Sequence, residues 1–397
     1  MTICVLGSGV VGVSTAFALS RAGHEVIVID KADRIAAGAS HANGAQLSWS
    51  YTDPMASPAV LPKLTGILLG RDPAMRVGLG GSPGAALHLA KWGTQFLGQC
   101  RSNAFRKNKD ARDGLAAESR AALDGFARDL PSNALQPTGV GKLVIAQTPR
   151  QLKEMRSQPN FLSAEECRDV EPALASWSAP QFGGLYSPDD SALDTLTYCT
   201  ALSALAREQF GARFELGQEV SEIIIRSGQV QGVRTIDRVL QCDTVVSCLG
   251  MRSNALLRPH GLSLPLMAVR GYSVTLPATE SAPRISVTDL FNKFVFANLG
   301  DRIRIAGFAD IATSARCQKS RIDTLLQTAR RVWPGIADYD APPHGWTGAR
   351  PMPPSGIPHI GETKVHGLYV NAGHGSLGYT FAAGSAMRIV DAIGAVQ

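Results

Sequence analysis

"TICVLGSGVVGVSTAFALSRAGHEVIVID" (residues 2–30) carries the signal that decides the fold. The run at 2–6 is short, apolar and rich in β-branched residues, which predicts a strand buried on both faces. Residues 10–23 show helical periodicity and end at Gly23, a residue type that often terminates helices. "HEVIVID" then supplies a second apolar strand that finishes on Asp30. The stretch therefore predicts a strand, a tight turn, a helix and a second strand.

The turn inside this unit has the spacing GxGxxG at Gly7, Gly9 and Gly12. The first glycine permits the tight turn, the second lets the backbone approach a pyrophosphate, and the third lets the helix lie close to the sheet. The N-terminus of the helix offers free N–H groups and a positive dipole end to phosphates. Asp30 can accept hydrogen bonds from a ribose 2′-OH, which disfavours NADP. The unit predicts dinucleotide binding, but it does not separate NAD from FAD.

Length and composition limit the class of protein. A chain of 397 residues is long enough for two domains, and 45% hydrophobic with 18% charged residues is typical of a soluble globular protein. The formal charge of +6 is small for this size and the basic residues are scattered. The nearest approach to a basic run lies within 101–112, where we expect a solvated surface. Nucleic-acid binding is therefore not expected.

Cysteine usage and hydropathy bear on the compartment. The seven cysteines show no CxxC pair and no metal-ligand spacing, which favours reduced thiols in the cytoplasm and no metal site. The apolar run at the start carries the glycine motif itself, so no signal peptide is expected. No uninterrupted apolar stretch reaches the length of a membrane span. Two apolar segments, 61–70 and 85–97, leave peripheral contact with the inner membrane open.

Three later segments bear on the choice of dinucleotide. "SHANGAQLSWSYTDP" (40–54) is a polar loop of small residues with room for a large cofactor, and "CDTVVSCLG" (242–250) is an apolar strand that ends in a glycine turn. "GLYVNAGHGSLGYTFAAGSAMRIVDAI" (367–393) predicts a strand, a glycine turn and a closely packed helix. Its helix N-terminus would suit the N1–C2=O edge of a reduced flavin, where negative charge gathers.

Together with "GGLYSPDDSALD", "VRGYSVTLP", "RIRIAGFADI" and "WTGARPMPPSGIPHIG", these motifs occur in the order found in D-amino acid dehydrogenases. The chain resembles these bacterial flavoproteins of the D-amino acid oxidase and glycine oxidase superfamily from residue 1 to about 393. The resemblance implies an α/β fold (α+β overall) with a glutathione-reductase-like, Rossmann-type FAD-binding domain and a substrate domain built on an antiparallel sheet. It is not specific to one substrate.

The resemblance also implies a discontinuous domain organisation. We expect the FAD-binding domain at 1–53, 180–258 and 344–397, and the substrate domain at 54–179 and 259–343. The residues are compatible with this division, because 140–148, 269–277, 293–300 and 302–311 have strand patterns. The last two are expected to form a hairpin at Gly300–Asp301, and a second hairpin is expected at Ser227–Gly228.

Oxidation of an amino acid requires a group that holds its carboxylate, for which a guanidinium fork is well suited. Arg350 stands between a glycine and a proline at the position that resembles the family's carboxylate-binding arginine. Tyr272 resembles a family tyrosine on the sheet facing the flavin. Tyr51 is expected to line the pocket, and His374, between two glycines, is expected at the flavin edge. Tyr379 follows in the same loop.

The predicted cofactor-binding residues come from the glycine turns, the second strand and the polar loop. They are Gly7, Gly9, Val10, Val11, Gly12, Asp30, Lys31, Ser40, Ala42, Asn43, Gly44, Gln46, Leu47, Val220, Gly250, Gly348, Gly373, Gly375, Ser376, Leu377, Gly378 and Thr380. Residues 318–397, the region where sarcosine-oxidase relatives tether FAD, contain no cysteine, so FAD is expected to bind non-covalently. Pro353 and Ser355 depart from the threonine and aspartate common in relatives.

The expected function is oxidative deamination of a D-amino acid, small and neutral or cyclic such as D-proline or D-alanine. A hydride would pass from the α-carbon to flavin N5, and the electrons would pass to a quinone or another acceptor. Three alternatives remain open at this point. They are an O2-using oxidase of glycine, sarcosine or a cyclic imino acid, an NAD-dependent dehydrogenase, and a non-catalytic flavoprotein subunit.

Overall fold

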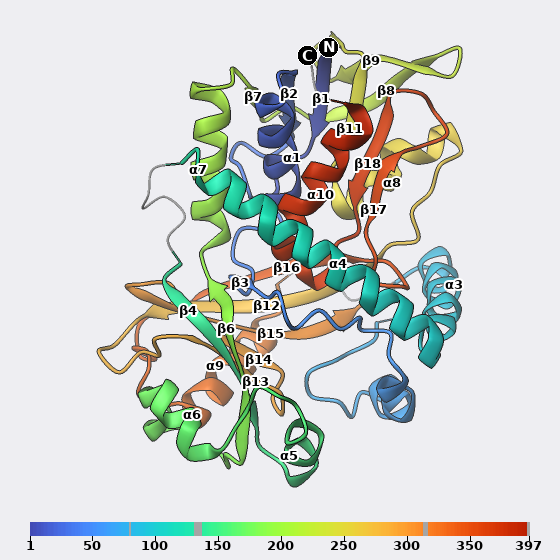
Figure 1. Cartoon of the computed structure of the whole chain (residues 1–397). Helices are drawn as coiled ribbons and strands as arrows, with labels where there is room; N and C mark the ends of the chain where they lie inside the picture. The colour runs from blue at the N-terminus through green and yellow to red at the C-terminus, as the bar shows by residue number, and fades with distance from the viewer. Residues whose placement is uncertain (79–80, 131–136, 313–316, 395–397) are drawn as a thin grey trace.

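The structure is a computed structural model that describes residues 1–78, 81–130, 137–312 and 317–394. Two large sheets organise the chain (Figure 1). A mostly parallel sheet lies in the upper part of the view with α1 and α10, and a large mixed sheet lies below it, with the long helix α4 (Ser102–Ala127) crossing in front. Both chain ends lie at the top, beside the first sheet.

The first sheet has six strands in the order β17-β18-β11-β1-β2-β7. Its central strand, β1 (Thr2–Leu6), pairs in parallel with β2 (Glu25–Asp30) on one side and with β11 (Thr244–Ser247) on the other. The next strand beyond β11 is β18 (Leu368–Ala372), from the other end of the chain. The sheet is therefore complete only when segments some 240 and 360 residues apart from β1 are in place. The predicted strands at both glycine turns are confirmed.

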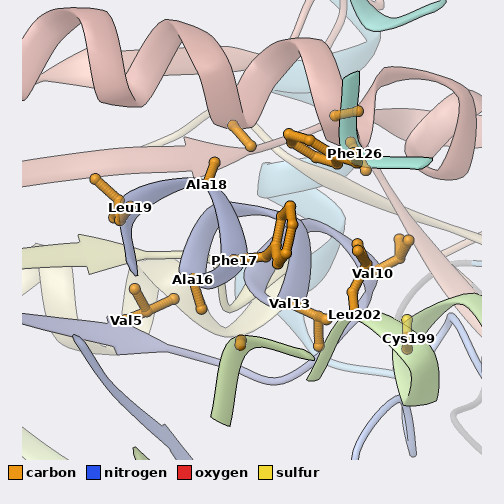
Figure 2. Close-up of a cluster of buried hydrophobic side chains, with 14 of the residues drawn as sticks. Val5, Val10, Val13, Ala16, Phe17, Ala18, Leu19, Phe126, Cys199 and Leu202 are labelled. Atoms are coloured by element: carbon orange, nitrogen blue, oxygen red, sulfur yellow. The ribbon is translucent and has the colours of Figure 1, made fainter. Parts of the chain in front are cut away.

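Helix α1 (Val10–Arg21) is buried at almost every position, so its sequence lacks a strongly polar face. Phe17 lies at its centre, fully buried, and meets the ring of Phe126 edge-on with centroids 4.8 Å apart (Figure 2). Small residues of α10 (Gly378–Ile393) and the apolar face of α7 (Thr195–Glu208) cover the same cluster. The helix ends two residues before Gly23, whose φ of 90° lets the chain turn back into β2.

The second sheet has nine strands in the order β16-β12-β15-β14-β13-β4-β6-β3 along its main path, with β5 paired to β6. Its longest strand, β12 (Met267–Pro277), pairs antiparallel with β15 (Arg302–Ile311) and β16 (His344–Met352). Helix α9 (Lys319–Val332) packs against one face of the sheet and shares a core with it. The predicted hairpins at 227–228 and 300–301 are confirmed.

The remaining elements are shorter or lie at the periphery. The strands are β3 (Gln46–Leu47), β4 (Gly139–Ala146), β5 (Phe161–Leu162), β6 (Gly183–Ala192), β7 (Arg213–Leu216), β8 (Val220–Arg226), β9 (Gln229–Thr235), β10 (Val239–Gln241), β13 (Ser286–Asp289), β14 (Phe294–Asn298) and β17 (His359–Glu362). The helices are α2 (Leu64–Leu68), α3 (Pro83–Gln99), α5 (Pro149–Met155), α6 (Ala164–Val170), α8 (Ser253–Leu257) and the 3-10 helices η1 (Pro58–Lys63), η2 (Pro172–Ser176), η3 (Gly250–Arg252), η4 (Arg258–His260) and η5 (Gly375–Leu377).

The division into two domains stays a prediction, but the sheets show how its segments are distributed. Strands β1, β2, β7, β11, β17 and β18 of the six-stranded sheet all come from segments assigned to the FAD-binding domain. Three further strands from those segments, β3, β6 and β16, lie in the nine-stranded sheet. The chain therefore passes several times from one large sheet to the other. Residues of both sheets line one cavity.

Candidate active site

A cavity of about 1630 Å³ is lined by both ends of the chain and by the large sheet. Its wall includes the turn after β1, the loop that precedes β3, residues of β12, β15 and β16, and the turn before α10. Small-molecule sites usually measure roughly 300–1,000 Å³. The cavity is therefore large enough for a long cofactor together with a small substrate.

The first glycine turn forms one wall of the cavity. Gly7 has a φ of 101°, a conformation that favours glycine, and a methyl group on Gly12 would lie 1.8 Å from the carbonyl oxygen of Gly7. The N-terminus of α1 thus lies directly against the turn. Gly9, Val10 and Val11 line the cavity, and Gly9 caps the helix without a side-chain hydrogen bond. One backbone donor, Val10 N, donates to Ser40 Oγ at 2.9 Å.

Asp30 lies at the end of β2, where the sequence predicts it, and also lines the cavity. Its Oδ2 accepts from the backbone N and from Oγ of Ser8, at 2.7 and 2.9 Å. Its Oδ1 accepts from the backbone N of Ala32 at 3.0 Å. These three bonds fix the carboxylate beside the glycine turn, with lone pairs left for a further donor.

The polar loop is anchored by hydrogen bonds to two strands of the large sheet and to α10. Ser273 Oγ donates to the Ala42 carbonyl at 2.6 Å, Gln46 Nε2 donates to Ser286 Oγ at 2.7 Å, and Ser48 N donates to Thr380 Oγ1 at 3.1 Å. Two backbone groups of the loop and the side chain of Gln46 thus hold the loop in place. Its small residues leave the cavity open.

The second glycine turn, before α10, forms another wall. Gly373 and Gly375 have φ values of 93° and 58°, and His374 between them is buried. No partner for His374 Nε2 is found among the described residues. Burial, with a contribution from His359, lowers the pKa of His374 to about 3, so the imidazole is neutral near pH 7. The neutral ring can therefore donate or accept one further hydrogen bond at this wall.

Arg350 lies on β16 and lines the cavity. Its Nη1 donates to the carbonyl of Phe308 at 2.9 Å, and its guanidinium packs against Gly271, where a methyl group would come within 2.4 Å of Nη2. Among the described residues no carboxylate lies within ion-pair distance of this guanidinium. Burial lowers its pKa, and Asp310 opposes that change. The side chain is therefore a fixed cation that has donors to spare.

Tyr272 lines the cavity from β12 and also packs into the core beneath the sheet. Its hydroxyl is buried and without a hydrogen-bond partner in the described part of the chain. Burial and the nearby Asp310 raise its pKa, so the phenol stays protonated at neutral pH and can donate. The ring meets Phe308 edge-on with centroids 6.1 Å apart. Tyr272 and Arg350 thus share contacts with one residue, Phe308.

Phe308 packs against a buried ion pair that the sequence did not predict. Arg321 on α9 and Asp310 on β15 are both buried, and Arg321 Nε donates to Asp310 Oδ2 at 3.0 Å. The Arg321 guanidinium also lies over the Phe308 ring, 4.3 Å from its centroid. The only sequence signal is an arginine in the apolar periodicity of α9, which does not reveal its partner.

A second missed cluster lies where the polar loop meets β4. Lys142 is buried, lines the cavity and donates from Nζ to Ser48 Oγ at 2.8 Å. Nζ also lies 3.6 Å from Asp190 Oδ2 and 4.8 Å from the ring centroid of Tyr51, a residue of the cavity wall that is 44% exposed. Burial lowers the pKa of Lys142, and Asp190 opposes that change. A lysine inside the apolar run "GVGKLVIA" was the available signal.

The structure brings most of the predicted site residues to this one cavity. All four predicted catalytic residues line it, and so do Tyr379 and eighteen of the predicted cofactor-binding residues. Four others do not: Gly12, Leu47, Val220 and Thr380. Gly12 and Thr380 instead contact residues of the wall: Gly12 packs against Gly7, and Thr380 Oγ1 accepts a hydrogen bond from Ser48 N. Val220 lines a separate pocket of about 230 Å³ that shares Asp30 and Lys31 with the main cavity.

The wall fits FAD by two independent observations. The N-termini of α1 and α10 both border the cavity, and such termini bind phosphates and other electron-rich groups. In addition, buried polar atoms without partners in the described structure, His374 Nε2 and Tyr379 Oη, belong to residues of the same wall. Residues of the first turn would hold the pyrophosphate, and residues of the second turn would hold the flavin edge.

A mostly parallel sheet with a glycine turn, joined to a mixed sheet over a shared cavity that fits FAD, is the arrangement expected of a flavin-dependent oxidoreductase. The chain belongs to the DAO family of FAD dependent oxidoreductases, whose model matches residues 2–392. The resemblance drawn from the motifs is confirmed, and FAD rather than NAD is the cofactor.

Similar proteins extend along the whole chain. "D-amino acid dehydrogenase 2" of Ralstonia nicotianae is 35% identical, covering 99% of this chain and 96% of the relative. "D-amino acid dehydrogenase" of Methylobacterium sp. is 36% identical, covering 99% and 95%. The crystal structure of glycine oxidase from Geobacillus kaustophilus matches with a TM-score of 0.75 at 21% identity, covering 98% and 94%, which supports the fold.

Two further findings concern metals and membranes. Within the described residues, no group of three or more His, Cys, Asp or Glu side chains is arranged to hold a metal ion. No helix in the described ranges has the length and hydropathy needed to cross a bilayer.

Proposed function

We propose that this enzyme oxidises a D-amino acid at its α-carbon and passes the electrons to a quinone or another acceptor. The observation that carries the proposal is Arg350, a cation in the cavity wall with no carboxylate partner among the described residues. The names of the relatives, D-amino acid dehydrogenases over nearly their full length, support the same substrate class.

Arg350 binds the substrate carboxylate in this proposal. A guanidinium can make two parallel charge-assisted hydrogen bonds to a carboxylate, and that geometry fixes the orientation of the α-carbon. The bond from Nη1 to the Phe308 carbonyl and the contact with Gly271 restrict the side chain before substrate arrives. Little conformational entropy is then lost on binding.

The Tyr272 hydroxyl assists Arg350 as a neutral donor. It is buried and unpartnered among the described residues, and its raised pKa keeps the proton in place. FAD, when bound, supplies the acceptor for the hydride equivalent. His374 and Tyr51 line the wall around the reacting group and help to exclude water. The imine product is then hydrolysed by water after release.

The aromatic wall near Arg350 favours a compact substrate. Tyr272, Phe308 and Trp346 line this part of the cavity, and none of them offers a charge to a substrate side chain. Small neutral or cyclic D-amino acids, such as D-alanine and D-proline, fit this chemistry best. Their ammonium must lose a proton before oxidation, so the reaction favours alkaline pH.

An apolar surface supports access to a quinone at the inner membrane. Exposed leucines occur on η1, α2 and α3 and just after α2, at Leu61, Leu68, Leu69, Leu87 and Leu97. The basic residues Lys63 and Lys91 lie on η1 and α3, and Arg71 follows α2. Such a combination suits peripheral contact of a cytoplasmic protein with an anionic lipid surface. Sedimentation with vesicles containing phosphatidylglycerol tests the contact.

The central experiment compares wild type with Arg350→Ala on D-alanine, D-proline, glycine and sarcosine, with an artificial dye or with O2 as acceptor. We expect dye reduction with D-amino acids and little peroxide. In Arg350→Ala, the free energy of binding should weaken by roughly 2–5 kcal/mol. This corresponds to a fall in kcat/KM of about 30-fold to several thousand-fold. Arg331→Ala, a change at an exposed arginine of α9, is the matched control.

The outcomes separate the competing functions. Strong peroxide release with poor dye reduction would identify an oxidase. Undiminished turnover by Arg350→Ala would place the carboxylate site elsewhere. A protein that binds FAD but reduces no acceptor with any of these substrates would contradict the proposed function.

A further inference from the structure

Lys142 is a buried cation in the cavity wall for which the proposed function has no use. Its side chain is 2% exposed, and it stands on β4, close to the polar loop and on a different strand from Arg350 and Tyr272. A buried lysine needs partners to offset the loss of hydration. Its contacts therefore show what this part of the wall is built to bind.

The ammonium group has more donors than partners. It carries three N–H groups, of which one donates to Ser48 Oγ at 2.8 Å. Asp190 Oδ2, at 3.6 Å, is too distant for a good hydrogen bond. At least one N–H thus has no close acceptor among the described residues, on a side chain that lines the cavity.

A second polar group without a partner lies on the neighbouring strand. Thr288 on β13 is 8% exposed, lines the cavity, and has a buried Oγ1 with no hydrogen-bond partner among the described residues. Strands β13 and β4 pair in parallel, with Ser286 opposite Lys142. Because alternate side chains share a face, Thr288 lies on the same face as Ser286. Lys142 and Thr288 therefore lie on the same face of neighbouring strands, and each brings to the cavity wall a polar group with hydrogen-bonding capacity left.

Charge indicates what that ligand is. Asp190 accepts from the backbone N of Trp49 at 2.8 Å and offsets the charge of Lys142 from the protein side. A carboxylate ligand would meet this negative charge, whereas a hydroxyl can accept from Lys142 and donate to Thr288 Oγ1. A neutral hydroxyl satisfies both groups without adding charge to the cluster.

We propose that Lys142, Thr288 and Ser48 form a subsite for a hydroxyl group on the substrate's side chain, so that the enzyme prefers hydroxylated D-amino acids to their unhydroxylated counterparts. The subsite rests on the proposed function, since it selects among D-amino acids held by Arg350. Lys142 is a specificity-determining residue here and takes no part in the oxidation step.

The test measures kcat/KM for matched pairs, D-serine against D-alanine and 4-hydroxy-D-proline isomers against D-proline, with the FAD-loaded enzyme. Wild type should prefer the hydroxylated member of at least one pair by about tenfold or more, the value of one hydrogen bond to a charged group. Thr288→Val keeps the shape of the side chain and removes its hydroxyl. Thr288→Val and Lys142→Met should each lower the preference for the hydroxylated substrate by about tenfold, while turnover of the unhydroxylated substrate changes little.

Controls separate the subsite from other roles. Lys153→Met removes an exposed lysine of α5 and should leave the preference unchanged. If Lys142→Met does not fold, the double variant Lys142→Met with Asp190→Asn avoids leaving a buried carboxylate without its cation. If neither variant folds, the effect of Thr288→Val on the preference for hydroxylated substrates decides whether the subsite exists. FAD content and the flavin absorption spectrum should match wild type in each variant.

Three results would overturn the subsite. They are a wild-type preference for unhydroxylated substrates or for D-aspartate, an unchanged preference in both variants, and an altered flavin spectrum that places Lys142 at the cofactor instead. If wild type oxidises D-alanine or D-proline and any of these results is found, the subsite is contradicted but the proposed function is still supported. Wild type that oxidises no D-amino acid fails the proposed function itself.

Discussion

The guanidinium of Arg350 lies against Gly271 so closely that a methyl group there would come within 2.4 Å of Nη2. The two residues belong to paired strands, β16 and β12, and the strand between Arg270 and Tyr272 carries a register shift at this point. Because Gly271 has no side chain, the Arg350 guanidinium can occupy the space beside it.

Gly271→Ala should displace Arg350 without removing its charge. The guanidinium at the far end of the Arg350 side chain would have to shift to admit the methyl group, and this misplacement predicts a KM for the amino acid roughly tenfold higher with FAD still bound. Steady-state kinetics and flavin absorbance measure the two effects. Gly114→Ala, in α4 with open space around it, should leave KM unchanged. An unaltered KM in Gly271→Ala would mean that Arg350 does not bind the substrate.

Gly12→Ala should prevent α1 from lying on β1, because the new methyl group would meet the Gly7 carbonyl at 1.8 Å. We expect loss of FAD and a free energy of unfolding lower by about 3 kcal/mol or more. Urea unfolding and flavin content test this, with Gly98→Ala in α3 as the control, since that position has open space. A variant that retains FAD and wild-type stability would contradict the packing described here.

Arg321→Met should leave Asp310 as a buried carboxylate with no cation to offset it. Removing one partner of such a pair costs about 3–5 kcal/mol, whereas removing both costs less. Arg321→Met with Asp310→Asn should therefore be more stable than Arg321→Met alone. Denaturant titrations of the two single variants and the double variant complete the cycle. Purely additive effects would rule out the coupling.

His374 should make the protein less stable in acid. Its pKa is lowered to about 3 in the folded state from an unfolded value near 6.5, so between these values the unfolded chain binds one more proton. Its contribution is complete above pH 6.5 and is lost as pH falls, by about 1.4 kcal/mol per unit. His374→Gln should flatten this dependence in urea titrations from pH 4.5 to 8. His366→Gln, at an exposed position, is the control. An identical slope in His374→Gln and wild type would refute this assignment.

Local patterns were enough to predict the strands and helices around both glycine turns, because each part of these units has its own residue signature. The hairpins at 227–228 and 300–301 were likewise predicted from short turn signals. The boundaries between segments were harder to place. Strand β16 carries Arg350 in a segment assigned to the cofactor domain, yet it pairs with β12 in the large sheet.

The missed residues are those whose role depends on a distant partner. Asp310 stands near the end of a mostly apolar strand, and nothing in that strand indicates its partner, Arg321 on α9. Lys142 likewise gains its meaning from Ser48 and Asp190, which are 94 and 48 positions away along the chain. Val220, expected at the cofactor, lines the smaller pocket that shares Asp30 and Lys31 with the main cavity, and its role there stays a prediction. Long-range pairing of this kind leaves no periodic trace in a single sequence.

Strand β1 is flanked on one side by β2 and on the other by β11, beyond which lies β18, near the end of the chain. During translation, the first glycine turn leaves the ribosome hundreds of residues before the second one exists. The nascent chain must therefore protect an unfinished parallel sheet until synthesis is nearly over. We therefore expect stable binding of FAD only after translation, and we expect a chain that lacks α10 to be purified without the flavin.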